Sequence, residues 1–235
     1  MLVAAAVCPC PPLLLPEVAT GAAPELDAAR TACADAVGLL AAARPDRLYV
    51  VGPADAAAAG VFPAGSTGSF AGFGVDLSVQ LGDGPAADRP LPASLAVGAW
   101  LLGRADWADA PVEGRGVNER EAAGTCAAVG RELAASAGRV ALLVMGDGSA
   151  CRTVKAPGYL DERAAGFDAE AARALGAADV AALLALDEEL AYELKAAGRA
   201  PWQVLAGAAE GAGLEGRLLH EDAPYGVEYV VAAWS

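Results

Sequence analysis

The chain has 235 residues, of which 30 are acidic and 16 are basic, and its formal net charge at pH 7 is −14. This charge argues against nucleic acids and anionic membranes as partners, because proteins bind phosphate groups through clustered Lys and Arg side chains. Hydrophobic residues make up 55% of the chain, yet no run of about 18 apolar residues is unbroken, so we expect no transmembrane helix.

The first part of the chain predicts buried strands that alternate with helices. Residues 2–7 are an apolar run that ends in Cys-Pro-Cys-Pro-Pro, and residues 47–51 are a second run that ends in Gly-Pro. Both runs are typical of buried strands. Apolar side chains at helical spacing predict a helix over residues 24–44. Residues 75–81 alternate like a strand after a loop rich in Gly, Ser and Pro.

The middle of the chain contains the strongest strand signal. Helical patterns come first, at residues 91–103 and 118–137, where Asn118 is the expected N-cap and Glu121 follows three residues later. The run of Val, Ala and Leu at residues 139–145 then predicts a strand that ends at Gly-Asp-Gly.

The last part predicts three helices and two terminal strands. The helices are expected at residues 161–175, 179–197 and 201–212, and the strands at residues 216–220 and 227–234. Strands that alternate with helices imply an α/β fold. No linker or internal repeat divides the chain. The sequence therefore predicts one α/β domain over residues 1–235, with a central, mostly buried sheet flanked by helices.

Cysteine usage indicates the cellular setting. The five cysteines are dispersed along the chain, as Cys8, Cys10, Cys33, Cys126 and Cys151. An odd number of dispersed thiols is not a disulfide framework, and it favours a reducing cytoplasm.

Ligands of α/β proteins gather in the loops that follow strand ends. The polar residues expected there are Cys8, Cys10, Asp55, Asp147, Ser149, Cys151, Arg152, Lys155, His220, Glu221, Asp222 and Tyr225. We take His220, Asp147 and Ser149 as candidate catalytic residues, since they supply an imidazole, a carboxylate and a hydroxyl. The alternatives are structural: Asp147 and Ser149 would cap a turn, and His220 would be a hydrogen-bonded edge residue.

Arg152, Lys155 and Tyr225 are the candidate ligand-binding residues. Two cations just past a strand end suit a carboxylate or phosphate on a small anionic or aromatic ligand. The alternative is that both cations pair with nearby acids such as Asp161 and Glu162.

Four short motifs fall at these loops and strands. They are Cys-Pro-Pro-Leu-Leu-Leu-Pro-Glu at 10–17, Tyr-Val-Val-Gly-Pro-Ala at 49–54, Gly-Asp-Gly-Ser-Ala at 146–150 and Ala-Pro-Tyr-Gly-Val at 223–227. Together they resemble class III extradiol ring-cleavage dioxygenases of the catalytic B-subunit type and their Memo-like relatives. The resemblance spans nearly the whole chain and implies that family's fold, with a small-molecule pocket at the carboxyl ends of the strands.

The chain departs from the family at its iron site. The resemblance places the family's two iron-binding histidines on Cys10 and Ala54, and its acid/base histidine on Ala150. It places the family's carboxylate ligand near Glu221 or Asp222. A two-histidine-one-carboxylate centre needs imidazoles at positions where this chain has none. We therefore expect the usual Fe(II) centre to be lost, and any bound metal to use Cys10 and Asp222.

Three functions remain open at this point. The first is a divergent enzyme of the extradiol type, and the second is a non-catalytic binding or scaffold protein on the same fold. The third is thiol chemistry, through a reactive Cys10 or Cys151 or through zinc, which accepts thiolate and imidazole ligands. The zinc ligands would be Cys8, Cys10, Cys151 and His220. A homo-oligomer is compatible with each function.

Overall fold

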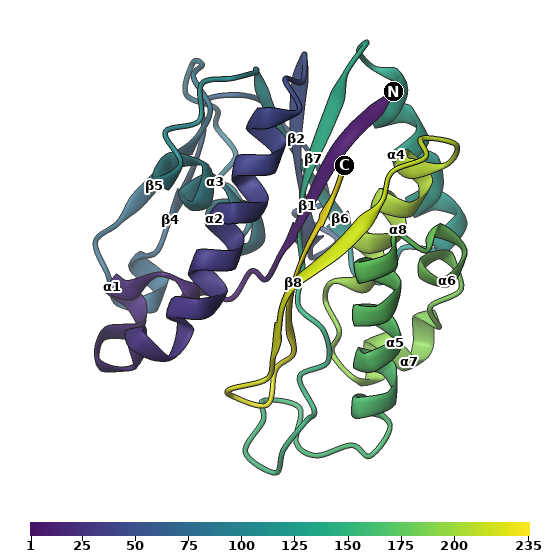
Figure 1. The fold of residues 1–235 in the computed structure, drawn as a ribbon. Coiled ribbons are helices and arrows are strands. Elements are labelled where there is room, and N and C mark those ends of the chain that lie inside the picture. The colour runs from purple at the N-terminus through teal and green to yellow at the C-terminus, as the bar shows by residue number, and fades with distance from the viewer.

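In the computed structural model, which describes residues 1–235, a seven-stranded sheet of order β3-β6-β2-β7-β1-β9-β8 runs through the centre of the protein (Figure 1). Its strands are β1 (Leu2–Cys8), β2 (Arg47–Ala54), β3 (Gly60–Phe62), β6 (Val112–Asn118), β7 (Val140–Met145), β8 (Gly216–Asp222) and β9 (Tyr229–Trp234). The four strands β6, β2, β7 and β1 are parallel. β3, β9 and β8 pair antiparallel to their neighbours. A separate hairpin contains β4 (Ser66–Ser69) and β5 (Ser78–Leu81).

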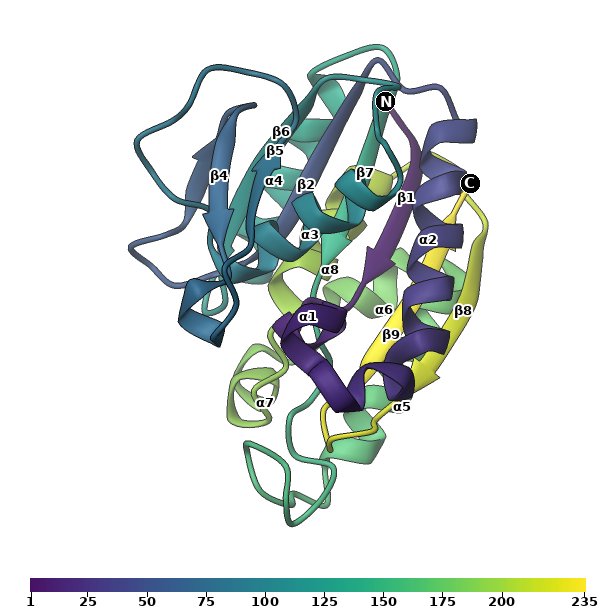
Figure 2. The ribbon, with the colours of Figure 1, turned by 90° about the vertical axis from the view of Figure 1, so that its left-hand side faces the viewer.

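Helices cover both faces of the sheet (Figure 2). One face carries α2 (Asp27–Ala42) and α3 (Ala93–Arg104), and the other carries α4 (Ala123–Ala135), α5 (Ala164–Ala177), α6 (Val180–Leu184), α7 (Glu188–Glu193) and α8 (Arg199–Ala209). The short segments are η1 (Pro12–Leu14), α1 (Pro16–Ala19), η2 (Thr20–Leu26) and η3 (Ala71–Phe73). None of the helices is both long and apolar enough to cross a membrane.

Each face of the sheet has its own apolar core. In β1, Ala5 and Val7 belong to the core under α4 and α8, whereas Ala4, Ala6 and Cys8 belong to the core under α2. This two-residue alternation is the period of a strand. Because β1 is buried on both faces, its residues form one continuous apolar run, as is typical of parallel sheets covered by helices. The expected α/β domain with a central sheet between helices is therefore confirmed.

Small residues bring α4 and α8 unusually close together. A side chain at Gly130 would collide with the Val204 carbonyl, and one at Gly207 would collide with the backbone of Ala127. Only glycine permits two helix backbones to approach at these positions. This contact fixes α8 against the sheet and so determines where its first turn lies.

The loop predicted before residue 75 contains the short strands β3 and β4, and two helix predictions were also wrong. Asn118 is the last residue of strand β6 and not a helix N-cap, since α4 begins at Ala123. The segment Val-Glu-Gly-Arg-Gly-Val-Asn contains two glycines and two charges, which weaken a strand signal. The single helix expected at residues 179–197 is divided into α6 and α7, because the Asp187 side chain accepts the N–H of Leu190 and begins a new helix.

The parallel strands all end at one edge of the sheet, which we call the carboxyl edge. Figure 1 shows this edge toward the bottom of the view, with the loops that follow β1 and β7 below it. The neighbouring strands β1 and β7 end at Cys8 and Met145, which are register partners. The polypeptide therefore leaves the two central strands side by side.

Candidate functional site

Cys10 and Asp147 meet at the centre of the carboxyl edge. The backbone N–H of Gly146 donates to the carbonyl of Cys8 at 3.0 Å, which keeps the two departing segments together. Two residues on, the backbone N–H of Cys10 donates to Asp147 Oδ1 at 2.8 Å, and the Cys10 thiol lies 3.8 Å from Asp147 Oδ2. Asp147 is half-buried and Cys10 is buried. The structure thus pairs a thiol with a carboxylate that sequence analysis had placed on separate loops.

Burial changes the acid–base behaviour of this pair. Burial raises the pKa of Asp147 to about 6, and the hydrogen bonds from Cys10 oppose that rise. The pKa of the Cys10 thiol is well above its ordinary value, first because of burial and then because of the Asp147 charge. At neutral pH the thiol therefore keeps its proton, and Asp147 is the group that exchanges a proton near physiological pH.

Tyr229 is the third member of this group. It is the first residue of β9, which lies next to β1, and only 2% of it is exposed. Its pKa is raised first by burial and then by the charges of Asp147, Tyr225 and Cys10. Its hydroxyl forms no hydrogen bond within the chain and is not among the fully buried atoms that lack a partner, so it keeps access to solvent. A donor that can reach a ligand or water therefore lies near Asp147. We call Cys10, Asp147 and Tyr229 the edge triad.

The segment that precedes α8 packs directly on the edge triad. The N–H of Gly198 donates to the Asp147 carbonyl at 2.8 Å. A side chain at Gly198 would collide with the Trp202 ring and would lie 2.9 Å from that carbonyl, so only glycine fits here. The next residue, Arg199, is 1% exposed, and its guanidinium donates to the carbonyls of Glu119 and Glu121. The start of α8 is therefore tied to the ends of both β7 and β6.

A cleft of about 570 Å³ opens beside this segment, between the end of β6 and α7. It is lined by Glu119, Glu189, Ala191, Tyr192, Glu193, Lys195, Ala196 and Ala197. Arg120 stacks on the exposed Tyr192 ring, 3.4 Å from its centroid. Glu119 connects the cleft with the edge triad, since its charge helps to raise the pKa of the Cys10 thiol. The cleft thus lies next to the end of β6, on the same side of the protein as the carboxyl edge.

Ser149 and Arg152 belong to a second, separate cluster. Ser149 is fully buried, and its backbone N–H and hydroxyl donate to the two carboxylate oxygens of Asp168 at 2.7 and 2.6 Å. Arg152 forms ion pairs with Asp168 at 3.2 Å and with Glu228 at 2.7 Å. Both carboxylates are buried. We call Ser149, Arg152, Asp168 and Glu228 the acid cluster. Its contacts are internal, so the guanidinium of Arg152 is already neutralised.

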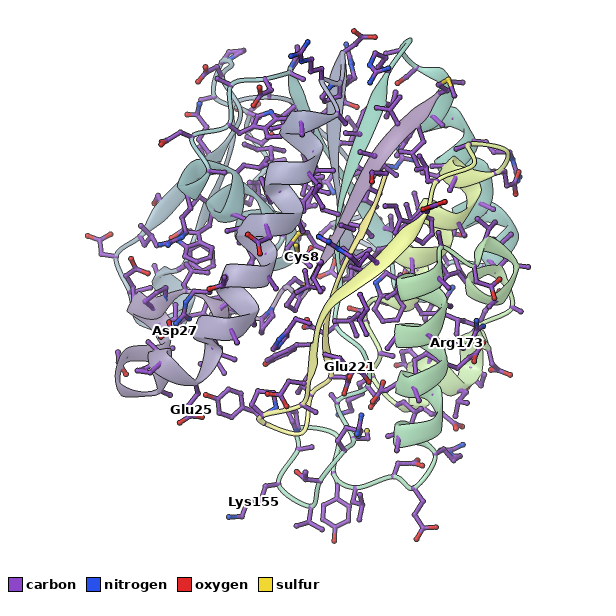
Figure 3. All side chains as sticks on the ribbon, viewed as in Figure 1. Cys8, Glu25, Asp27, Lys155, Arg173 and Glu221 are labelled. Carbon is purple, nitrogen blue, oxygen red and sulfur yellow. The ribbon has the colours of Figure 1, made fainter.

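The remaining sequence candidates lie apart from the edge triad. Lys155 is exposed at the tip of the loop after β7 and points away from the protein (Figure 3). Asp222 is exposed at the end of β8 and caps its own turn through the N–H of Ala223. Tyr225 donates to Glu25 at 2.9 Å, which joins the β8–β9 hairpin to η2. His220 is on β8, the outermost strand, two strands away from β1.

The thiols do not form a zinc site either. Cys8 packs between β1 and α2, where its thiol contacts Cys33 (Figure 3). Cys151 lies in the core on the other face of the sheet, with its thiol on the Leu194 carbonyl at 3.4 Å. The pKa of Cys151 is raised, mainly by burial, so a reactive thiolate is disfavoured there as well.

The residues at the carboxyl edge do not fit the family's Fe(II) centre. Cys10 is turned toward Asp147, Ala54 offers no donor atom, and His220 is on a distant strand. No group of three His, Cys, Asp or Glu side chains is arranged to hold a metal ion. The donor set of a two-histidine-one-carboxylate site is therefore missing in space as well as in sequence.

Sequence reasoning missed several residues that the structure brings to the carboxyl edge. Tyr229 falls in a segment that reads as a plain buried strand, so its hydroxyl gave no signal. Arg199 lies just before the helix expected at residues 201–212. Glu119 was assigned to a helix, although it follows strand β6. Glu119 could have been identified as a residue that follows a strand, but strand β6 was not predicted.

Comparisons with known proteins support the fold alone. No family model matches the sequence, and a search of curated proteins finds no match. Among solved structures, the chain is similar to the crystal structure of an uncharacterized protein from Escherichia coli K12, with 15% identity and a TM-score of 0.62. The alignment covers 99% of each chain. The two proteins therefore share the whole architecture of the α/β domain.

Proposed function

We propose that this chain is a divergent protein of the extradiol-dioxygenase type that binds a small molecule at the carboxyl edge without a ferrous centre. The observation that carries the proposal is the edge triad. Two of its members come from the loops after β1 and β7, where the family resemblance expects a pocket. The third, Tyr229, contributes a hydroxyl that has no partner in the chain.

The chemistry of the edge triad favours binding through hydrogen bonds. The Tyr229 hydroxyl has no acceptor in the chain and keeps access to solvent, so it is free to donate to a ligand or to water. Asp147 supplies an acceptor whose second oxygen contacts only the weak Cys10 thiol donor. The neighbouring cleft, which is lined by Glu119 and not by the edge triad itself, has room for a small molecule.

A second function, metal-independent acid–base catalysis, is favoured by one observation. The pKa of Asp147 is raised to about 6, which is close to the value that suits a general base at neutral pH. In this reading Asp147 accepts a proton from the bound molecule. The Cys10 thiol stays protonated, and the backbone N–H of Cys10 positions the carboxylate.

Binding is tested with the purified, full-length chain and a set of catechols, phenols and benzoates. We expect at least one compound to bind, and we expect D147A and Y229F to weaken that binding. The matched control is D109N, which alters an exposed acid far from the carboxyl edge, in the loop before β6. If no compound binds, or if D109N weakens binding as much as D147A does, the proposal is wrong.

Elemental analysis and a ring-cleavage assay separate the alternatives. We expect no stoichiometric iron and no cleavage of catechol. If the protein contains iron that is lost in the C10A variant, and if it cleaves catechol, it is an ordinary extradiol dioxygenase instead. A turnover that disappears in D147N, with a rate that rises through pH 6, would establish the acid–base enzyme. Binding without any turnover would support the hypothesis of a non-catalytic binding protein.

A further inference from the structure

The first turn of α8 contains two buried N–H groups that have no acceptor. They are Nε of Arg199 and Nε1 of Trp202. The two residues are 1% and 0% exposed. The indole groups of Trp107 and Trp234, by contrast, donate to the carbonyls of Ala110 and Leu175. Buried donors without acceptors are rare, and each one needs an explanation.

Arg199 is also a buried cation without an ion pair, and the acid that its charge influences is Glu119, whose pKa is raised by burial and lowered by Arg199. Its guanidinium donates to the carbonyls of Glu119 and Glu121 and to the amide oxygen of Gln203 at 2.9 Å. All three acceptors are uncharged. The protein carries a net charge of −14, yet no carboxylate forms an ion pair with this guanidinium. Buried charges are ordinarily paired, since removing a lone ion from water is costly.

Both donors belong to the first turn of the same helix. Arg199 and Trp202 are three residues apart in a helix and therefore lie on one face. The Trp202 ring packs on Gly198, and Gly198 bonds to the Asp147 carbonyl. The N-terminal end of α8 adds the partial positive charge of its helix dipole. The first turn of α8 therefore brings one buried cation and two unpartnered N–H donors to the segment that bonds to Asp147.

We propose that the first turn of α8, with Arg199 and Trp202, binds a carboxylate group of the ligand. This inference rests on the proposed function and names the ligand class, which is a small carboxylic acid. A carboxylate has two oxygens in one plane, which suits two N–H donors on one helix face. A doubly charged phosphate is disfavoured because three glutamates line the adjoining cleft, which begins at Ala196 and Ala197 just before Gly198.

The test uses benzoate as the probe and benzamide as a neutral match of the same shape. The full-length protein is labelled with ¹⁵N, and the indole N–H signals are followed during titration at pH 7.5. We expect the Trp202 signal to move downfield with benzoate and not with benzamide, because only the anion is a strong acceptor. The Trp107 and Trp234 signals should not move, since those groups are already bonded.

Variants assign the effect to the two donors. We expect R199Q to raise the dissociation constant of benzoate about tenfold or more, and W202F about threefold, as losses of a charged and a neutral hydrogen bond. The control is R104Q, which removes the same charge from an exposed site on α3, on the opposite face of the sheet. If R199Q folds poorly, the movement of the wild-type indole signal still decides the question.

Three results would overturn the proposal. They are an unmoved Trp202 signal at saturating benzoate, equal affinity for benzoate and benzamide, and benzoate binding that survives in R199Q. The proposed function can survive the failure of this inference. If catechols or phenols bind and D147A weakens them while benzoate does not bind, the carboxyl edge is a ligand site and only the carboxylate assignment is wrong.

Discussion

Arg152 and Arg199 both reach into the interior of the protein, but their surroundings are opposite in charge. Arg152 lies between two buried carboxylates, so the acid cluster has more negative groups than positive ones. Arg199 has uncharged acceptors only. The unpartnered atoms match this difference, since the acid cluster leaves the acceptor Oε1 of Glu228 free and the α8 turn leaves two donors free.

The difference indicates what each centre does. The acid cluster connects three segments of the chain: the loop after β7, which carries both Ser149 and Arg152, helix α5, and the residue just before β9. A proton on Glu228 offsets the excess negative charge of the acid cluster, because burial and the Asp168 charge raise the pKa of Glu228 to about 7. The charge of Arg199 cannot be removed by a change in protonation, since a guanidinium does not lose its proton in proteins. Glu119 is the acid that the Arg199 charge influences, and the proposed carboxylate ligand would supply a further negative charge.

The largest effect is expected when the acid cluster loses its cation. The substitution R152M leaves two buried carboxylates facing each other without a counter-charge. We expect the free energy of unfolding to fall by about 3 kcal/mol, the low end for a broken buried ion pair, because Arg152 is itself 30% exposed. Urea unfolding at pH 7.5 measures this change. The control is R163Q, whose ion pairs are at the surface and whose unfolding midpoint should stay unchanged.

A smaller loss is expected at the α8 turn. The substitution R199M removes hydrogen bonds to two carbonyls, but it also removes a buried cation that has no partner. We expect the free energy of unfolding to fall by about 1–2 kcal/mol, less than for R152M. Saturating benzoate should then stabilise the wild type and not R199M. A larger loss for R199M than for R152M would contradict the comparison of the two centres.

The pH dependence of stability should reveal the proton on Glu228. The pKa of this group is about 7 in the folded protein against an ordinary value of 4.5. Between these two values the folded state holds a proton that the unfolded state has released. The free energy of unfolding therefore decreases as pH rises from 4.5 through 7, by roughly 1 kcal/mol after solvent screening. In E228Q, which does not titrate, this part of the decrease should be absent from unfolding curves measured across that range.

The sequence predicted the fold better than it predicted the site. Strands such as β1 and β7 are long apolar runs that end in Pro or Gly, and both were placed correctly. Strand β6 was missed because its two glycines and alternating charges resemble a loop. That single omission also hid Glu119, since a residue is recognised as a strand-end residue only when its strand is recognised.

The site depends on pairings that no local pattern contains. Ser149 and Arg152 follow a strand end, as candidate site residues should, but they turn inward because Asp168 and Glu228 lie there. Those two acids are 19 and 76 residues away from their partners. Cys10 and Asp147 were both anticipated, and their contact follows from the parallel register of β1 and β7. Sequence spacing predicts which loops meet, whereas the direction of each side chain is determined by its partners.

The smallest effect on stability is expected at Tyr229, where the prediction separates binding from folding. The hydroxyl has no partner in the chain, so Y229F should change the free energy of unfolding by less than about 0.5 kcal/mol. The same substitution should weaken ligand binding several-fold, since the ligand then loses the donor that the Tyr229 hydroxyl supplies. Urea unfolding and calorimetric titration of the same sample measure both quantities. A large loss of stability without any change in affinity would mean that the hydroxyl serves the fold, and the edge triad would then be no more a ligand site than the acid cluster is.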